Sequence, residues 1–348
     1  MSKITLGILG GGQLGSMLSV AAKKLNIKTI IYCDDQSAPA QNFCDEFIHA
    51  KYNDKNEIYS FAKKVDLITY EFENIPFVTL NELNKLKKVL PKPSVNRLIQ
   101  HRLAEKDFIN KLNIRTTRYA HIENKKDLEP LGDFLPGILK TTTMGYDGKG
   151  QYPIQNINQL DSLNIDFSKE YILEKLVKLK KEISVIITRF KNYKYEIYEP
   201  IENTHEEQIL KYSKIPADIS EHLFEQSKKW AIQIAEELKY VGTLCVEFFI
   251  DRNDNLYVNE IAPRVHNSGH LTINAYNISQ FENHVRAVCS LEQIPLKKIS
   301  NAEMLNIIGK QIVPYREKPK LDNNQFLFDY LKKEIKEKRK MGHLTTLK

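Results

Sequence analysis

Residues 246–270 read VEFFIDRNDNLYVNEIAPRVHNSGH and have the pattern of a β-hairpin, with two apolar runs on either side of a polar turn at 251–255. Glu247 lies in the first run and Glu260 in the second, both far from the turn. Pairing of the strands therefore predicts that the two carboxylates are close together. With the amide of Asn259 beside them, they form an all-oxygen group of the kind that holds Mg²⁺ against substrate phosphates. The alternative is a surface hairpin with ordinary charged ends.

The loop after the hairpin favours a functional site. Four polar side chains follow within five residues, between a proline and a glycine: Arg264, His266, Asn267 and Ser268. So many anion-binding and hydrogen-bonding groups serve no evident folding purpose. The hairpin and its loop together predict a site for an anionic substrate.

Size and charge narrow the class of protein. A chain of 348 residues is long enough for two or three domains, and 42% hydrophobic residues is ordinary for a soluble protein. We expect no membrane partner, because no apolar run reaches the length of a membrane span and the N-terminus does not read as a signal peptide. Four widely spaced cysteines without a CxxC pair indicate a cytoplasmic protein without a zinc site or disulfides. The net charge of +7 is spread along the chain, which argues against a nucleic-acid partner and suits small anionic substrates.

The chain divides into regions with different patterns. Apolar strand patterns at 4–9, 28–32 and 65–70 alternate with helix patterns and predict a parallel sheet with crossover helices. Two prolines near residue 92 suggest a boundary, and a helix is expected over 96–112. An α+β pattern follows, with strands at 137–140, 171–174 and 182–189, a helix at 227–238, the hairpin, a helix at 279–291 and a small module beyond 294.

Two glycine loops point to different proteins. The first, Gly10-x-Gly12-x-x-Gly15, lies between a strand and a helix and matches the dinucleotide fingerprint, with Asp34 or Asp35 after the second strand. This supports a nicotinamide-dependent oxidoreductase, unless the glycines only permit a tight turn.

The second loop favours a different enzyme. Lys140 ends a strand, and the glycine-rich residues 144–151, MGYDGKGQ, follow closely. Such a backbone can lay its N–H groups over phosphates while the lysine supplies a charge. The segment has no Walker A pattern. A dehydrogenase has no use for this loop followed by an acidic metal pair, whereas an ATP-driven ligase needs both.

Several motifs together resemble one family. They are GGGQLG, TYEFENI, LKTTTMGYDGKGQ, ILEK with a glutamate eight residues after its own, and VNEIAPRVHNSGH. They are similar to those of N5-carboxyaminoimidazole ribonucleotide synthetase, an ATP-grasp enzyme of purine biosynthesis. The resemblance runs from the first strand to His343, nearly the whole chain.

The resemblance implies a fold of the α/β and α+β classes in three parts. These are a Rossmann-like N-terminal domain (1–95), an ATP-grasp central domain with a mobile lid (96–290) and a small C-terminal domain (291–348). It implies that ATP, bicarbonate and 5-aminoimidazole ribonucleotide are the substrates, with Mg²⁺ and without NAD. The product would be N5-carboxyaminoimidazole ribonucleotide, formed through carboxyphosphate. The resemblance also implies a homodimer.

The resemblance also assigns residues. Catalytic roles fall to Arg264, His266 and Asn267, and the metal ligands are Glu247 and Glu260. The ATP contacts are Arg102, Lys140, Gly145, Tyr146, Asp147, Gly148, Lys149, Gly150, Gln151, Glu174, Lys175, Leu176, Val177, Glu182, His205, Asn259 and Glu260. Contacts to the ribonucleotide are Gln13, Tyr146, Lys333 and Arg339.

This chain departs from the family pattern near its C-terminus. The family has a glycine-containing PGRK turn where this chain has residues 337–340, EKRK, with one extra residue before it, so Lys332 could take the role of Lys333. The chain also stops soon after His343, which suggests a trimmed C-terminal domain or an incomplete chain. Simpler readings stay open for three positions: His205 as a loop histidine, Tyr146 as packing and Gln13 as a helix-cap contact.

Overall fold

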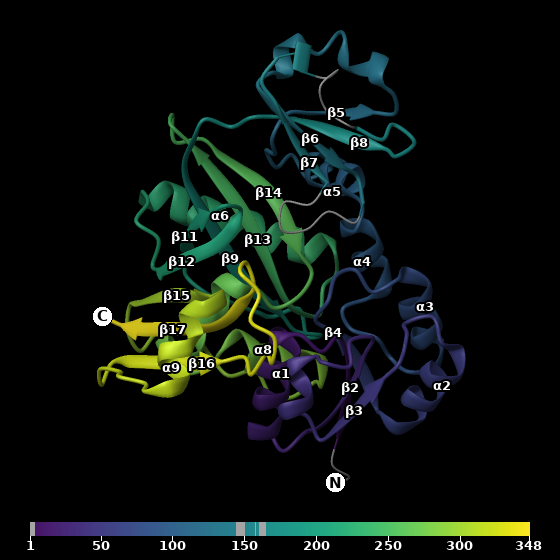
Figure 1. The fold of residues 1–348 in the computed structure, drawn as a ribbon, viewed down its shortest axis with the longest axis vertical. Coiled ribbons are helices and arrows are strands. Elements are labelled where there is room, and N and C mark those ends of the chain that lie inside the picture. Colours follow the sequence, from purple (N-terminus) through teal and green to yellow (C-terminus); the bar gives the residue numbers. More distant parts are fainter. Residues whose placement is uncertain (1–3, 144–149, 157, 160–164) are drawn as a thin grey trace.

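The computed structural model describes residues 4–143, 150–156, 158–159 and 165–348, and these residues form three sheets (Figure 1). The first is a four-stranded sheet of β1 (Thr5–Leu9), β2 (Lys28–Cys33), β3 (Glu46–His49) and β4 (Leu67–Tyr70). Its order is β3-β2-β1-β4 and all pairs are parallel, which confirms the predicted parallel sheet. The helices that follow its strands are α1 (Gln13–Lys24), α2 (Lys55–Lys64) and α3 (Phe77–Leu86).

A helix from much later in the chain also packs against this sheet. Helix α8 (Gln280–Val288) places Phe281 and Val285 in the same buried cluster as Leu6 and Ile8 of β1. In addition, the ring of His284 lies 2.8 Å from the Thr69 hydroxyl of β4. Figure 1 shows α8 beside α1 at the base of the molecule. The N-terminal sheet and the later part of the chain therefore share one core.

The helix expected over 96–112 is interrupted. The structure has α4 (Pro93–Ile99) and α5 (Arg102–Lys111) instead. His101 between them has extended backbone angles, φ −117° and ψ 104°, and its side chain accepts a hydrogen bond from the N–H of Ala104. A histidine in this capping role starts a new helix, so Arg102 becomes the first residue of α5.

A second, antiparallel sheet forms the upper lobe in Figure 1. It has the order β5-β8-β6-β7, from β5 (Tyr119–Ile122), β6 (Gly137–Thr141), β7 (Gln151–Ile154) and β8 (Tyr171–Lys175). It has its own buried cluster, which includes Leu139, Tyr171 and Leu173. Short 3₁₀ turns accompany it, η2 (Lys125–Leu128) and η3 (Gly132–Phe134).

The third sheet joins the central and C-terminal parts of the chain. Its order is β14-β13-β9-β11-β12-β15-β17-β16, with β10 paired to β9. The central strands are β9 (Leu179–Arg189), β10 (Tyr195–Ile197), β11 (Ile201–Glu206), β12 (Ile209–Ile215), β13 (Gly242–Asp251) and β14 (Leu256–Ala262). The C-terminal ones are β15 (Ala302–Ile308), β16 (Gln325–Asp329) and β17 (Lys340–Leu347). Since β12 pairs with β15, the predicted C-terminal module extends the central sheet.

The remaining elements cover this sheet or connect its strands. Helix α6 (Glu221–Glu237) packs on β9 and β13 through Ala231, Ile234 and Ala235. The others are η1 (Pro39–Asn42), η5 (Asn267–Leu271), α7 (Thr272–Ala275), η6 (Gly309–Ile312) and α9 (Val313–Glu317). Within the described ranges, no helix is both long enough and apolar enough to cross a membrane.

Candidate active site

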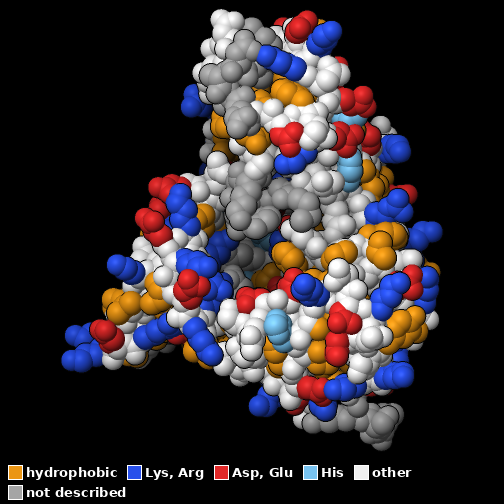
Figure 2. Space-filling view, turned by 45° about the vertical axis from the view of Figure 1, so that its right-hand side comes forward, with side chains coloured by type: hydrophobic (Ala, Val, Ile, Leu, Met, Phe, Trp, Pro, Cys, Tyr) orange, Lys and Arg blue, Asp and Glu red, His pale blue; other side chains and the backbone are white. Residues whose placement is uncertain are grey.

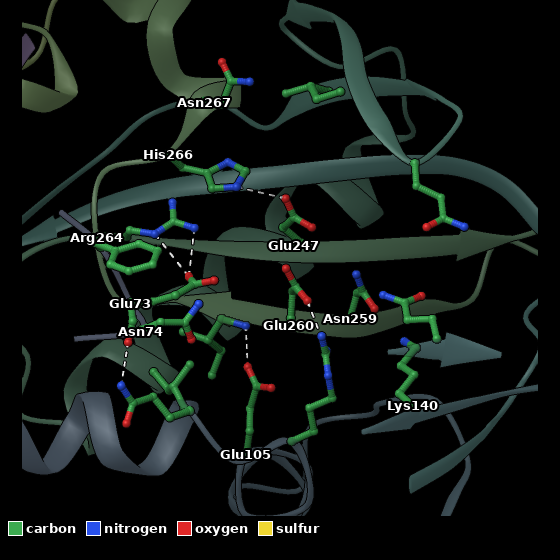
Figure 3. A pocket seen from close by; sticks show the side chains of 18 of the residues that line it. Glu73, Asn74, Glu105, Lys140, Glu247, Asn259, Glu260, Arg264, His266 and Asn267 are labelled. Atoms are coloured by element: carbon green, nitrogen blue, oxygen red, sulfur yellow. Dashed lines mark hydrogen bonds and ion pairs between the residues drawn. The ribbon is translucent and has the colours of Figure 1, made fainter. Parts of the chain in front are cut away.

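One cavity of about 850 Å³ is lined by residues from all three sheets. Figure 2 shows the surface hollowed between the β5–β8 lobe and the rest of the molecule. Lys140 and Glu174 line the cavity from the β5–β8 lobe, and Gln13 and the first glycine loop line it from the N-terminal sheet. The predicted hairpin lies between them (Figure 3).

The two hairpin carboxylates meet as the sequence predicts. Glu247 of β13 pairs directly with Glu260 of β14. A β-bulge follows at once, because Phe248 pairs with Val258 and leaves Asn259 as the extra residue. The bulge allows Asn259 and Glu260, although consecutive, both to line the cavity.

The adjacent carboxylates of Glu247 and Glu260 favour a bound cation. Burial raises the pKa of Glu247, and the neighbouring charge of Glu260 raises it further. The described residues contain no group of three or more His, Cys, Asp or Glu side chains arranged for a metal. Two carboxylates and the Asn259 amide nevertheless fit Mg²⁺, which binds through one or two carboxylates and completes its shell with phosphates and water.

Two lysines share one carboxylate on the side of the cavity formed by the β5–β8 lobe. Lys140 Nζ lies 3.1 Å and Lys106 Nζ 3.6 Å from Glu174 Oε2. Burial raises the pKa of Glu174, but the two ammonium groups outweigh it and the pKa falls to about 2. Lys106 also donates to the hydroxyls of Thr116 and Thr117 and to the carbonyl of Asn259. The Glu174 carboxylate is therefore ionised and holds Lys140 at the cavity wall.

Further along this wall, His205 of β11 lies beside Glu182 of β9, with Nδ1 2.6 Å from Oε2. Burial lowers the pKa of His205, but contact with Glu182 outweighs it, so the pKa is raised. Gln151, Lys175, Leu176 and Val177 also line the cavity, while Gly150 does not. Gly150 has φ +69°, and a Cβ there would lie 2.6 Å from the Thr141 hydroxyl, so glycine is required.

Arg264 is held by an acid from the N-terminal part of the chain. Its Nε and Nη2 donate to Glu73 Oε2 at 3.1 and 2.8 Å (Figure 3). Its Nη1 donates to the Val265 carbonyl at 3.2 Å. Burial lowers the pKa of Arg264, but Glu73 and other nearby carboxylates raise it overall, so the guanidinium stays charged.

Unlike the charged Arg264, the next two site residues, His266 and Asn267, offer uncharged polar groups. His266 Nε2 lies 3.2 Å from Glu247 Oε1, and its Nδ1 lies 2.9 Å from the Ser268 hydroxyl. Burial and the charge of Arg264 lower the pKa of His266 well below its usual value, so the ring is neutral. Both amide atoms of Asn267 are buried without a hydrogen-bond partner in the described structure, so they can serve a ligand.

A buried acid that follows β4, Glu71, lies against the first glycine loop, where a dinucleotide would need positive potential. Gly12 donates its N–H to Glu71 Oε1 at 2.7 Å. A Cβ on Gly10, which has φ +103°, would lie 2.7 Å from the same oxygen. Burial raises the pKa of Glu71 above its ordinary value. The carboxyl group thus uses an N–H that a diphosphate would otherwise accept from.

Most sequence-predicted residues line this cavity. They are Gln13, Arg102, Lys140, Gln151, Glu174, Lys175, Leu176, Val177, Glu182, His205, Glu247, Asn259, Glu260, Arg264, His266 and Asn267. Gly145, Tyr146, Asp147, Gly148 and Lys149 lie outside the described residues. Lys333 is exposed and Arg339 donates to the Glu334 carbonyl; neither is among the lining residues. Lys332 is, and its ammonium donates to Gln13 Oε1 at 2.8 Å.

Sequence reasoning did not assign roles to several residues that belong to the site. They are Glu71, Glu73, Glu105, Lys106 and Lys340. Glu105 accepts the N–H of Ile261 at 2.6 Å and so fixes the end of the hairpin strand. Glu71 and Glu73 follow β4 at the carboxyl end of the parallel sheet, where ligands commonly bind. This position in the sequence could have identified them as candidate site residues.

Comparison with known proteins identifies the family. A ribonucleotide synthetase preATP-grasp domain matches residues 1–100, an ATP-grasp domain 107–281 and a phosphoribosylaminoimidazole carboxylase C-terminal domain 302–348. The N5-carboxyaminoimidazole ribonucleotide synthase of Bacillus subtilis is 38% identical over 347 residues, covering 99% of this chain and 91% of the relative. The chain belongs to the N5-carboxyaminoimidazole ribonucleotide synthase family.

Solved synthase structures agree along the whole chain. An ADP complex of an N5-carboxyaminoimidazole ribonucleotide synthetase has a TM-score of 0.94 and 36% identity, covering 100% of this chain and 94% of that one. The Aspergillus clavatus synthase in complex with ADP and 5-aminoimidazole ribonucleotide has a TM-score of 0.90 and 26% identity, covering 99% and 94%. The predicted fold class and membership of a family of ATP-grasp ligases are therefore confirmed.

Proposed function

We propose that this chain carboxylates 5-aminoimidazole ribonucleotide with bicarbonate at the expense of ATP, giving N5-carboxyaminoimidazole ribonucleotide, ADP and phosphate in purine biosynthesis. The observation that carries the proposal is one shared cavity, which Lys140 and Glu174 line from the β5–β8 lobe, the first glycine loop lines from the N-terminal sheet, and Glu247, Glu260 and Arg264 line between them. Both substrates can then reach the same reacting centre. The A. clavatus synthase was solved in complex with ADP and 5-aminoimidazole ribonucleotide, which supports the choice of these two ligands.

Glu247, Glu260 and Asn259 would hold Mg²⁺ at the phosphates of ATP. The metal would neutralise phosphate oxygens during transfer of the γ-phosphoryl group to bicarbonate. Lys140, fixed by Glu174, supplies a further positive charge in this cavity. Arg102 lies 3.5 Å from Glu260 and links the metal pair to the start of α5.

Bicarbonate would be held by the loop after the hairpin. Arg264 can offer parallel donors to a planar anion, and Glu73 fixes the plane of its guanidinium. His266 and Asn267 lie on the same loop and line the same cavity. The amine of the ribonucleotide would then attack carboxyphosphate or the CO₂ released from it.

The ribonucleotide would lie over the first glycine loop. Its phosphate would meet Lys332, which lines the cavity beside Gln13, so we transfer to Lys332 the role first assigned to Lys333. Gln13, Tyr146 and Arg339 remain proposed contacts from the family resemblance.

A nicotinamide-dependent oxidoreductase is the competing function. The buried Glu71 carboxyl accepts the Gly12 N–H that the diphosphate of NAD would need, which argues against it. The proposal therefore includes no NAD.

The test measures ADP release in the presence of Mg²⁺ and bicarbonate, with and without 5-aminoimidazole ribonucleotide. We expect the ribonucleotide to stimulate ADP release and one carboxylated product to form per ADP. Unstimulated ATP hydrolysis would indicate another ATP-grasp ligase. NADH binding without ATPase activity would support the oxidoreductase.

Other features are proposals from the family resemblance. We expect a homodimer, which sedimentation would test. We also expect a cytoplasmic enzyme, in keeping with four free cysteines, three buried and Cys44 partly so. The domain limits 1–95, 96–290 and 291–348 likewise stay a proposal, which limited proteolysis would test.

A further inference from the structure

Four further side chains, linked to one another by hydrogen bonds, run from His266 across the large sheet. The His266 Nδ1 lies 2.9 Å from Ser268 Oγ, which lies 2.7 Å from Ser184 Oγ. Asn203 Nδ2 donates to Ser184 Oγ at 2.9 Å, and the Ser213 hydroxyl donates to Asn203 Oδ1 at 2.8 Å. All four residues beyond the histidine are buried.

The sheet places this chain of hydrogen bonds beside the proposed metal pair, on the same face. Ser184 of β9 pairs directly with Glu247 of β13, and Asn203 of β11 pairs with Ser213 of β12. Directly paired residues of antiparallel strands have their side chains on the same face. Ser268, in η5, lies over that face and reaches both Ser184 and His266.

One direction of donation satisfies every contact of this chain of hydrogen bonds. Because Asn203 donates to Ser184 Oγ, the hydroxyl hydrogen of Ser184 is available for Ser268 Oγ. The hydroxyl hydrogen of Ser268 is then left for His266 Nδ1, which also accepts the Ser268 backbone N–H at 3.4 Å. A ring nitrogen that accepts carries no hydrogen, so the hydrogen of the imidazole is on Nε2, the atom facing Glu247.

We propose that Ser184, Ser268 and Asn203 are positioning residues that hold His266 in its Nε2–H form, with that hydrogen directed into the anionic part of the cavity. The inference rests on the proposed carboxylation. The other tautomer would present a lone pair to Glu247 and to any anion bound there, and so would repel both. A fixed donor needs no rearrangement when the anionic carboxyphosphate forms.

A purely structural role is the alternative, since buried hydroxyls generally need partners. The same strand offers a matched control for it. Thr188 of β9 and Thr243 of β13 form another buried hydroxyl pair, also at 2.7 Å, and neither residue lines the cavity. Thr188→Val removes one hydroxyl from this pair without touching His266.

The experiment compares Ser268→Ala, Ser184→Ala, the double variant and Thr188→Val. Ser268→Ala removes the hydrogen bond from the Ser268 hydroxyl to His266 Nδ1. We expect this loss to lower kcat about tenfold. Ser184→Ala should lose several-fold, because Ser268 can still donate. KM for ATP should not change. Since the links act in series, the double variant should match Ser268→Ala alone, and Thr188→Val should keep wild-type kcat.

A measurement that does not depend on turnover accompanies the kinetics. The ¹⁵N NMR shifts of His266 should show the Nε2–H tautomer in the wild type and a mixture in Ser268→Ala. Nδ1–H in the wild type, additive losses in the double variant, or an equal loss in Thr188→Val would each overturn the inference. If the wild type shows the Nε2–H form but does not carboxylate the ribonucleotide, the proposed function fails instead.

Discussion

Replacing Arg264 by lysine separates the charge of this residue from its geometry. Arg264 contacts Glu73 Oε2 through two nitrogens, at 3.1 and 2.8 Å, and the Val265 carbonyl through a third. A lysine ammonium keeps the positive charge but has no planar set of donors. In the variant, the ammonium group can replace at most one of the two nitrogens that contact Glu73.

The loss can be sized as one donor that a lysine cannot direct at the bicarbonate-derived anion. A hydrogen bond to a charged group contributes about 1.5–3 kcal/mol, so losing one in the transition state lowers kcat/KM by roughly tenfold to 150-fold. An interaction made mainly in the transition state lowers kcat in the same proportion. We expect KM for ATP to stay near the wild-type value and the carboxylated product formed per ADP to fall.

Arg286 provides a closely matched control. It contacts Glu282 Oε1 through Nε at 3.0 Å and Nη2 at 2.9 Å, and donates through Nη1 to the Glu292 carbonyl at 3.2 Å. It lies on α8 and is not among the residues that line the cavity. Arg286→Lys should therefore keep full activity. If Arg264→Lys also retains wild-type kcat and product per ADP, Arg264 is only structural, and the bicarbonate site is misplaced.

Three other results are expected. Glu247→Gln and Glu260→Gln should each lower turnover by orders of magnitude with little change in Tm, and near-normal turnover in Glu260→Gln would refute the metal assignment. Glu174, with its pKa lowered to about 2, stabilises the fold above its ordinary pKa of 4.5; that stability is lost as the pH falls toward 2. The Tm of the wild type should therefore fall more steeply over this range than that of Glu174→Gln. Calorimetry with millimolar NAD should show no binding, because Glu71 uses the Gly12 N–H; micromolar affinity would reverse the choice of function.

The features predicted correctly from sequence depend on local patterns. Strand–helix alternation gave the parallel sheet, and the two apolar runs around 251–255 gave the direct pairing of Glu247 with Glu260. Both follow from residue order and periodicity alone. The break at His101 was missed because helix propensity does not reveal that an imidazole will accept the N–H of Ala104.

Features that depend on distant contacts could not be read in this way. Glu73 and Arg264 are 191 residues apart, and nothing in either local pattern specifies the other. The bulge at Asn259 depends on a single extra residue in one strand, which an apolar pattern does not register. The choice between Lys332 and Lys333 has the same cause: in an irregular segment, a shift of one residue decides which side chain faces the cavity.

The charges of the cavity explain why its substrates would bind together. Arg102 contacts Glu260, Lys140 contacts Glu174 and Arg264 contacts Glu73, so three cations of the site already face carboxylates. Glu247 instead faces the neutral ring of His266, and its pKa is raised by burial and by the neighbouring carboxylate of Glu260. Mg²⁺ arriving with ATP would offset that repulsion and lower the pKa of Glu247. The metal–nucleotide complex would then complete the site in which Arg264 would hold the second anion, so nucleotide and bicarbonate should bind with positive cooperativity.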